Sequence, residues 1–405
     1  MSRLPVRAAL VALCAALAVW LGACSPKDED RREVVSVWST IPAPTLAPWV
    51  ASFEAASPRL RVVVRTFAEA GFADSVASAL AAGRPPDLAT LPSEALPRLL
   101  AAGVLSDWSA GVADLRDSLR GWDLCMLGDA IYGLPWLLDS RVLYYNVARW
   151  SAAGGAAGGP LDAAALKHVA SRNRGALGLA LGGGAGMFDA FAPWGWASGV
   201  EIGTASLDTV WIASDASAAV MSALLALRRT ARIASQDSLE LAFARGQLTL
   251  VVAGAELASR LVARTPSLVH GAVPVPSFVP GAESRAFVRG TVLASFTDSR
   301  RKEDALRFAR FLVEPTSLAA LARRLDGPVP ASAHADTTAW AARSPARAAL
   351  SHALAAARAY PVHPAWRELE LKLDSLFTLA FAGRVPVAEA LMAADTLLVI
   401  QAKSR

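Results

Sequence analysis

Residues 129–146 read DAIYGLPWLLDSRVLYYN. The stretch contains two β-rich runs, 131–135 and 141–145. Before it, strand-like and helix-like segments alternate along the chain. We expect strands over 34–38, 60–65 and 87–91, and helices over 48–56, 73–82, 93–102 and 110–119. Alternation at this spacing predicts βαβ units and a mostly parallel sheet.

The chain after residue 146 repeats this alternation. A Gly/Ala tract at 152–159 marks a loop or a boundary. We expect strands over 177–181, 248–253 and 288–295, and helices over 217–231, 256–263 and 301–312. From Pro345 onward the pattern is helical, with a break near 361–364. The predicted fold class is therefore α/β, with two units and a helical tail.

The composition is that of a folded chain with two domains. The sequence has 405 residues, of which 54% are hydrophobic and 19% are charged, so a disordered chain is excluded. The formal net charge is +5, and the densest basic run, Arg300-Arg301-Lys302, is short. A nucleic-acid binder would carry a basic stripe with interleaved aromatic side chains. The sequence has none, so we expect no nucleic-acid partner.

Residues 1–24 read MSRLPVRAALVALCAALAVWLGAC, which is typical of a secretion signal. Arg3 and Arg7 precede an apolar run over 8–20, and that run is too short for a convincing transmembrane helix. It ends in Leu21-Gly22-Ala23-Cys24, which is similar to a bacterial lipobox. The alternative is an ordinary secretory peptide with a chance cysteine.

The lipobox interpretation predicts a signal peptide over 1–23, a lipid on Cys24 and a charged tether over 24–33. The protein would then be anchored to the membrane through the lipid. Of the other two cysteines, Cys14 lies in the apolar run and Cys125 has no partner for an intramolecular disulfide. We expect Cys125 to be a small buried side chain.

No motif of an enzyme stands out. The sequence lacks a Gly-x-Ser-x-Gly elbow, and the glycine-rich run 182–186 has no Lys-Ser/Thr after it. The five histidines are dispersed and do not have the spacing of metal ligands. We therefore expect no cofactor, no metal and no enzymatic activity. A glycoside hydrolase with a pair of carboxylates is the alternative, since carboxylates are plentiful.

Tryptophan is unusually frequent, with 12 residues against 4 tyrosines. Trp38 ends the first predicted strand, and Trp194 and Trp196 occur in Pro-Trp-Gly-Trp. Strand ends and the loops after them are where α/β proteins bind ligands. A flat aromatic ring can cover the apolar face of a sugar, while polar groups bind its hydroxyls. Packing in the core is the alternative for these three residues, and it is the interpretation we favour for Trp49, Trp108, Trp122, Trp340 and Trp366.

Several segments in order along the chain carry a family resemblance. They are 54–62 (EAASPRLRV), 81–89 (AAGRPPDLA), 99–108 (LLAAGVLSDW), 129–146, 243–254 (FARGQLTLVVAG), 273–276 (VPVP), 303–312 with 328–330 (PVP), and 381–391 (FAGRVPVAEAL). Together they resemble extracellular solute-binding proteins of sugar ABC importers, the group that includes maltose-binding protein. One departure is the short stretch 146–175, where Pro160-Leu161-Asp162 replaces the family's tryptophan-bearing signature.

The resemblance implies a two-lobe periplasmic-binding-protein-like fold, each lobe a mostly parallel sheet flanked by helices. The chain would cross between lobes at 137–139 and around 283–287, with the ligand cleft between the lobes. The implied segments are 34–138 and 287–340 in the N-terminal lobe, and 139–286 with the tail 341–405 in the C-terminal lobe.

By position, the resemblance also implies a set of ligand-binding residues in the cleft. They are Trp38, Ser39, Glu69, Asp139, Trp194, Trp196, Gly254, Glu256, Arg289 and Gly290. For the acidic residues and Arg289, the alternative is surface charge or a salt bridge between the lobes.

The implied function is capture of a mono- or oligosaccharide by hinge closure. The protein would be a monomer on the extracytoplasmic, periplasmic face of a bacterial membrane. It would deliver the sugar to the transmembrane permease subunits of an ABC importer, which an ATPase drives. Besides the hydrolase, a solute sensor or scaffold of the same fold that no longer serves transport is the other alternative.

Overall fold

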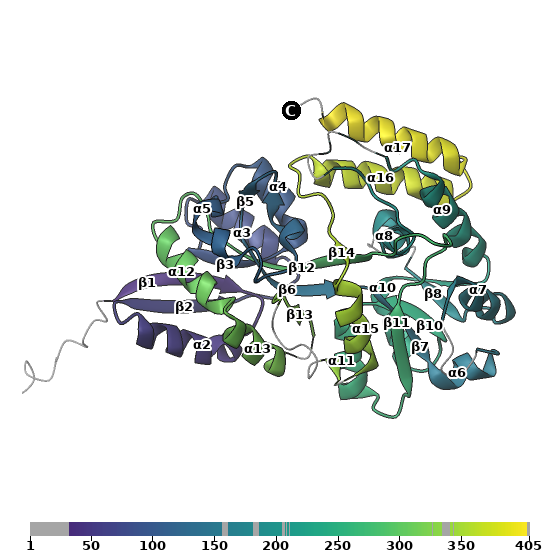
Figure 1. The fold of residues 1–405 in the computed structure, drawn as a ribbon, viewed down its shortest axis with the longest axis horizontal. Coiled ribbons are helices and arrows are strands. Elements are labelled where there is room, and N and C mark those ends of the chain that lie inside the picture. Colours follow the sequence, from purple (N-terminus) through teal and green to yellow (C-terminus); the bar gives the residue numbers. More distant parts are fainter. Residues whose placement is uncertain are drawn as a thin grey trace, which may run out of the picture.

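The computed structural model describes residues 32–155, 161–180, 186–204, 207, 209, 211–325, 327–333, 341–342 and 344–402. Two lobes lie side by side and are joined by strands that cross between them (Figure 1). The predicted signal peptide, Cys24, residues 24–31 of the tether and Trp340 lie outside the described residues. None of the helices in the described part of the chain combines the length and the apolar character that crossing a bilayer requires.

The N-terminal lobe is built on a sheet with the strand order β13-β6-β12-β3-β1-β2. Its strands are β1 (Glu33–Ser39), β2 (Leu60–Thr66), β3 (Leu88–Pro92), β6 (Leu134–Ser140), β12 (Ala286–Ala294) and β13 (Val329–Pro330). A separate small hairpin is formed by β4 (Met126–Leu127) and β5 (Ala130–Ile131). Alternate side chains of β1 enter the core, because a strand has a two-residue period: Val35 and Val37 are buried.

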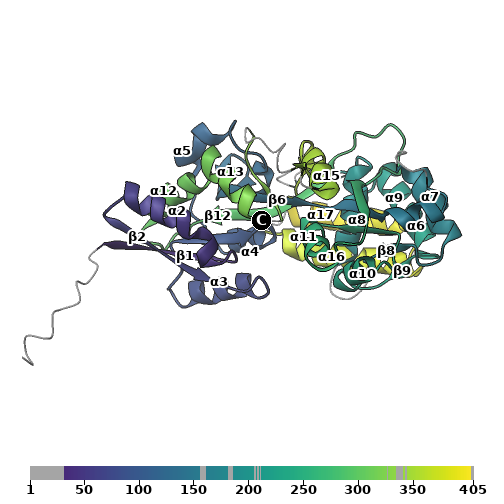
Figure 2. The same ribbon diagram turned by 90° about the horizontal axis from the view of Figure 1, so that it is seen from below.

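Helices cover both faces of this sheet. They are α2 (Ala43–Ala56), α3 (Phe72–Ala81), α4 (Leu96–Ala101), α5 (Ser109–Val112), α12 (Lys302–Leu312) and α13 (Pro315–Arg324), with short 3-10 turns at Ser93–Ala95, Ala113–Leu115 and Trp122–Leu124. Figure 2 shows α3 and α4 on one face, and α2, α12 and α13 on the other. The buried side chains of α3 and α4 belong to one hydrophobic cluster, which continues into the C-terminal lobe, and those of α2, α12 and α13 belong to another.

The C-terminal lobe is built on a sheet with the order β11-β7-β10-β8-β9. Its strands are β7 (Val142–Asn146), β8 (Leu177–Leu179), β9 (Arg232–Ile233), β10 (Leu250–Ala253) and β11 (His270–Pro274). Its helices are α6 (Val147–Ala152), α7 (Ala163–Arg172), α8 (Met187–Ala197), α9 (Asp215–Arg228), α10 (Gln236–Ala244), α11 (Ala255–Arg264), α15 (Pro345–Leu354), α16 (Trp366–Phe381) and α17 (Val387–Ala402). The helical tail and its break are confirmed, because α15 ends before Pro361 and α16 begins after Pro364.

The α/β class is confirmed, but both sheets are mixed rather than mostly parallel. β1 is parallel to β2 and β3, and β10 is parallel to β8. The pairs of β12 with β3 and β6, and of β7 with β10 and β11, are antiparallel. The reason is that β12 comes back from the other lobe and inserts between two strands of the first sheet. Such a long-range insertion is not visible in local sequence periodicity.

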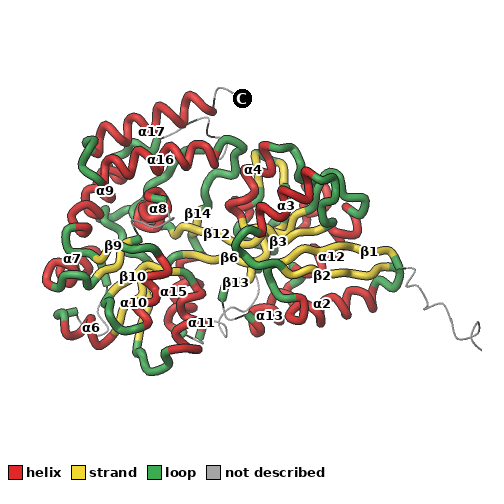
Figure 3. The backbone as a smooth tube through the Cα atoms, turned by 180° about the vertical axis from the view of Figure 1, so that it is seen from behind, coloured by secondary structure: helices red, strands yellow, loops and turns green. Residues whose placement is uncertain are grey.

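Three segments cross between the lobes. The chain passes from β6 to β7 at Arg141, two residues beyond the predicted crossing at 137–139. It returns along β12, whose first residues pair with β14 (Ala357–Arg358). Figure 3 shows β6, β12 and β14 running together between the two groups of helices. Short paired strands of this kind form a hinge that holds the lobes in register.

Helix α8 places the Pro-Trp-Gly-Trp residues differently from the sequence prediction. Trp194 and Trp196 lie within α8 rather than in a loop, and they are only 1% and 4% exposed. The Trp194 ring stacks on Phe278 with centroids 5.1 Å apart. Pro193 and Gly195 resemble a turn in the sequence, yet burial of nearly every side chain of α8 against α9 and α16 stabilises the helix.

Candidate ligand-binding site

A hollow of about 250 Å³ lies between the lobes, where several strands end; we call it the polar chamber. Glu69 follows β2 and Glu94 follows β3 on one side, and Glu256 follows β10 on the other. The loops after parallel strands converge at one edge of a sheet. Most of the predicted site residues line this chamber: Glu69, Asp139, Gly254, Glu256, Arg289 and Gly290.

Arg289 of β12 is the central cation of the polar chamber. Its guanidinium lies 3.7 Å from Asp139 of β6 and 3.8 Å from Glu94 of the N-terminal lobe. Burial acts to lower the pKa of Arg289, but the two carboxylates outweigh it and raise that pKa. The Asp139 carboxylate also accepts a hydrogen bond from the Ala255 amide at 3.1 Å, at the start of α11. Asp139 therefore links the hinge to the C-terminal lobe.

Two other carboxylates of the C-terminal wall, those of Glu240 and Glu256, are tied to Arg260 of α11. Arg260 pairs with the buried Glu240 and lies 3.8 Å from Glu256. Glu240 also accepts a hydrogen bond from the Gln236 amide at 2.7 Å. The chamber therefore has a pre-formed network of charges, in which polar groups are already oriented before a ligand arrives.

Gly254 and Gly290, the two predicted glycines, contribute no polar side chain. They are needed because neighbouring atoms pack closely against the backbone at both positions. A Cβ atom at Gly254 would lie 2.6 Å from an Asp139 carboxylate oxygen. At Gly290 it would lie 2.2 Å from the carbonyl oxygen of Leu137. A side chain at either position would therefore push apart the hinge strands and the α11 terminus.

A smaller cavity of about 70 Å³ opens beside the polar chamber; we call it the Arg141 recess. Arg141, Gln236 and Arg289 line both hollows. Apolar walls of the recess come from Trp194 and Phe287. Thus Trp194, although it is a core residue, presents part of its surface to the inter-lobe space.

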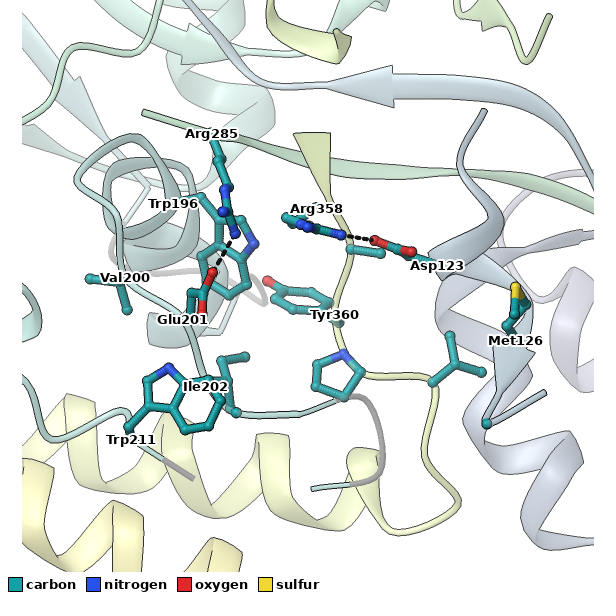
Figure 4. Close-up of a pocket in the computed structure, with 15 residues that line it drawn as sticks. Asp123, Met126, Trp196, Val200, Glu201, Ile202, Trp211, Arg285, Arg358 and Tyr360 are labelled. Carbon is teal, nitrogen blue, oxygen red and sulfur yellow. Dashed lines mark hydrogen bonds and ion pairs between the residues drawn. The ribbon is translucent and has the colours of Figure 1, made fainter. Parts of the chain in front are cut away.

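A larger hollow of about 380 Å³ lies at the same boundary; we call it the aromatic chamber. Trp196, Trp211 and Tyr360 face it, as Figure 4 shows. Two ion pairs flank it, one between Arg285 and Glu201 and one between Arg358 and Asp123, the latter at 3.3 Å. Trp211 is 37% exposed and offers a ring face to a ligand, whereas Trp196 presents only a small part of its surface.

Tyr360 lies between the aromatic chamber and the other hollows. Together with Arg289 it lines a narrow gap of about 30 Å³ that leads from one to the other. Its ring lies 4.4 Å from that of Phe287 and its hydroxyl donates a 2.7 Å hydrogen bond to Asp189. Burial and the Asp189 charge raise the pKa of Tyr360, so the hydroxyl stays protonated.

Two predicted site residues line none of these hollows. The Trp38 ring packs on Phe67, with centroids 4.5 Å apart, and lies beneath Arg65. Ser39 is fully buried, and its hydroxyl accepts a 2.9 Å hydrogen bond from the Ile41 amide. Both residues support the end of β1 in the arrangement described.

Sequence reasoning missed several residues that line the hollows. They are Glu94, Arg141, Gln236, Glu240, Trp211 and Tyr360. Arg141 was visible in the sequence as the charged residue that begins the second β-rich run, 141–145. Tyr360 and Trp211 carried no local signal, because distant segments bring them to the boundary.

The described residues contain no group of three side chains suited to holding a metal ion. Cys125 is free and fully buried, as expected from the cysteine count, and burial raises its pKa. Its thiol therefore has little nucleophilic character.

Comparison with known families identifies the class of protein. The sequence profile of the bacterial extracellular solute-binding protein family matches residues 48–349. The chain belongs to this family, and the family assignment implies an extracytoplasmic protein. Among curated proteins, none matches the chain significantly.

Solved structures with the same fold are numerous. A cyclic α-maltosyl-1,6-maltose binding protein from Arthrobacter globiformis has a TM-score of 0.79 at 18% identity, covering 92% of this chain and 100% of that one. The sugar-binding protein MalE from Xanthomonas citri has a TM-score of 0.77 at 18% identity, covering 92% and 98%. The GacH receptor of Streptomyces glaucescens, solved with acarbose, has a TM-score of 0.75 at 17% identity, covering 92% and 99%. These likenesses establish the two-lobe fold.

Proposed function

We propose that this chain is the substrate-binding lipoprotein of an ABC importer that captures a carbohydrate between its lobes. The observation that carries the proposal is the cleft itself. Two lobes joined by three short crossing segments contribute charged groups to the polar chamber and ring faces to the aromatic chamber. A saccharide needs both, because its rings have apolar faces and its rim carries hydroxyl groups.

Hinge closure supplies the mechanism. In an open form the chambers are accessible, and a sugar that contacts both lobes stabilises the closed form through that difference in contacts. Two of the structures described above are receptors for cyclic α-maltosyl-1,6-maltose and for acarbose, and the third is a sugar-binding protein, which supports the choice of ligand class. The closed protein would then dock as a monomer on a permease, while the lipid on Cys24 keeps it near the membrane.

The test is a titration of the chain beginning at Ser25, which retains every described residue. Tryptophan fluorescence and Tm are followed across mono-, di- and oligosaccharides. We expect one sugar to give a saturable shift, and about 2.7 kcal/mol of added stability at 100 times its Kd. Calorimetry on Trp211→Ala should show weaker binding, whereas Met392→Ala, on the exposed face of α17, should bind normally.

Other outcomes would point elsewhere. A folded protein that responds to no sugar contradicts the carbohydrate assignment. A shift that decays as the sugar is consumed indicates the glycoside hydrolase. Saturable binding without any association with permease subunits, measured in reconstituted membranes, indicates a sensor or scaffold.

A further inference from the structure

Arg141 is a cation without a partner at the centre of the molecule. It is the single residue between β6 and β7, where the chain crosses between lobes. Within the described part of the chain it makes no hydrogen bond and no ion pair. Burial, together with the nearby Arg289, lowers its pKa, although the charges of Asp139, Glu240 and Asp189 act to raise it.

The carboxylates around Arg141 are already engaged by other groups. Asp139 is bound by Arg289 and the Ala255 amide, and Asp189 accepts the Tyr360 hydroxyl. Glu240 is bound by Arg260 and Gln236. Arg141 is only partly buried, and a partly desolvated guanidinium is stabilised by a partner that neutralises it. An anionic ligand would supply a direct partner that these engaged carboxylates do not.

The Arg141 recess is suited to a small anion. Two guanidinium groups, those of Arg141 and Arg289, face a cavity of about 70 Å³, and Asp189 is the sole carboxylate in its described lining. Trp194 and Phe287 form apolar walls, which strengthen electrostatic attraction by excluding water. The recess adjoins the polar chamber, because Arg141, Gln236 and Arg289 line both, so its cations lie within reach of a group attached to a larger ligand.

We propose that the solute is an acidic saccharide whose carboxylate binds Arg141 in this recess. The inference rests on the proposed function and narrows it from carbohydrates to uronate-type sugars. A planar carboxylate matches the guanidinium fork in a bidentate pair. A phosphate fits less well, because its second negative charge would lie close to Asp139, Asp189 and Glu240. A neutral sugar would leave Arg141 uncompensated when the cleft closes.

The experiment compares matched ligands on the chain beginning at Ser25. Glucuronate is paired with glucose, galacturonate with galactose, and oligogalacturonides with neutral galacto-oligosaccharides; glucose 6-phosphate provides the phosphate arm. Binding is measured by calorimetry. We expect the acidic member of one pair to bind about 10- to 100-fold more tightly than its neutral partner, the range of one charge-assisted hydrogen-bonded pair.

Substitutions of Arg141 test whether this residue causes the preference for the acidic sugar. Arg141→Gln should remove the preference for the acid while binding of the neutral sugar stays within about threefold. Arg141→Lys keeps the charge but not the fork, and should retain part of the preference. Arg98→Gln, at an exposed pair with Asp74, is the matched control and should change nothing.

The outcomes separate this inference from the proposed function. Equal or tighter binding of the neutral sugars overturns the acidic saccharide and leaves the carbohydrate receptor standing. Preference for the phosphate over the carboxylate also overturns it. A folded protein that binds no member of this panel overturns the uronate-type ligand, whereas the carbohydrate receptor is overturned only if the wider sugar titration also gives no response. The comparison of wild-type affinities is decisive even where Arg141→Gln does not fold.

Discussion

The polar chamber and the aromatic chamber lie at the same inter-lobe boundary, but different kinds of segment build them. The polar chamber collects residues that follow strands, such as Glu69, Glu94 and Glu256. The aromatic chamber is lined by Trp196 near the end of α8, by the loop residue Trp211 and by the segment before α16 that carries Tyr360. In the polar chamber, Arg289 pairs with Asp139 and Glu94; in the aromatic chamber, the rings of Trp196 and Tyr360 pack on one another between two flanking ion pairs.

The two chambers differ in what holds their side chains in place. Groups that follow strands are positioned by the sheets themselves, so under the proposed hinge closure they would move as rigid parts of each lobe. Groups brought by the tail depend on packing of α16 against α8, which is a property of the C-terminal lobe's core. The polar chamber is therefore expected to be sensitive to charge, and the aromatic chamber to volume.

The largest expected effect is on the stability of the C-terminal lobe, whose hydrophobic core contains Trp194. Trp194→Ala should lower the free energy of unfolding by about 3–5 kcal/mol, because it removes a buried ring that stacks on Phe278. Urea unfolding followed by circular dichroism measures it. An unchanged unfolding midpoint would show that Trp194 belongs to the site rather than to the core.

The next effect concerns the charges of the polar chamber. Asp139→Asn should lower the free energy of unfolding by about 1–2 kcal/mol, because Arg289 loses its nearest charge while the amide oxygen can still accept from Ala255. Thermal unfolding measures the change. Asp74→Asn, at an exposed pair with Arg98, is the control and should shift stability by less than about 0.5 kcal/mol.

A smaller effect is expected at Trp211 in the aromatic chamber, where a substitution should change ligand affinity but not stability. Trp211→Ala should weaken binding of the proposed sugar by about 2- to 10-fold, the contribution expected of one stacked ring. Since Trp211 is 37% exposed, its removal should leave the unfolding midpoint nearly unchanged. Calorimetry and urea unfolding on the same sample check both statements. A large loss of stability would assign Trp211 to the core.

The smallest effect is a pH dependence at the gap between the chambers. Burial, with the Asp189 and Asp374 charges, raises the pKa of Glu370 above its ordinary value of 4.5, although Arg367 acts to lower it. The folded state thus holds this proton more tightly than the unfolded state. The group's favourable contribution is complete below pH 4.5 and is lost as pH rises through the higher folded-state pKa.

Glu370→Gln should therefore raise the free energy of unfolding at neutral pH by less than about 1 kcal/mol. The gain should shrink as the pH falls toward the ordinary pKa of glutamate. Chemical unfolding at a series of pH values measures this difference. Glu368→Gln, at an exposed pair with Lys372 on the same helix, provides the matched control. A gain that grows on acidification would contradict the assigned sign.

Much of the fold was predictable because its signals are local. The β-rich runs and helix stops placed β1, β2, β3, β7 and β10 to within a few residues. Convergence of Glu69, Asp139 and Glu256 was likewise foreseeable once the family resemblance fixed the strand order. The antiparallel pairing of β12 with β3 and β6 was not predictable from the sequence. It arises because β12 returns from the other lobe and inserts between these two strands.

The aromatic residues show where local signals end. Trp194 and Trp196 sit in a sequence that resembles a turn, and only the contacts of α8 with α9 and α16 make it a buried helix. Trp38 lies at the end of β1 as predicted, yet its ring packs on Phe67 and lines none of the hollows described above. A tryptophan's position along the chain does not tell which face of its ring stays accessible, because neighbouring elements decide that.

By itself, the sequence determined the α/β class, the order of its elements and the charged residues that end its strands. These follow from side-chain periodicity and from the geometry of the backbone, which act over a few residues. Only the tertiary structure decided which tryptophans are core, where Tyr360 lies and why Arg141 has no partner. Those properties depend on burial and on charges contributed by segments far apart in the chain, and such contacts exist only once both lobes have folded.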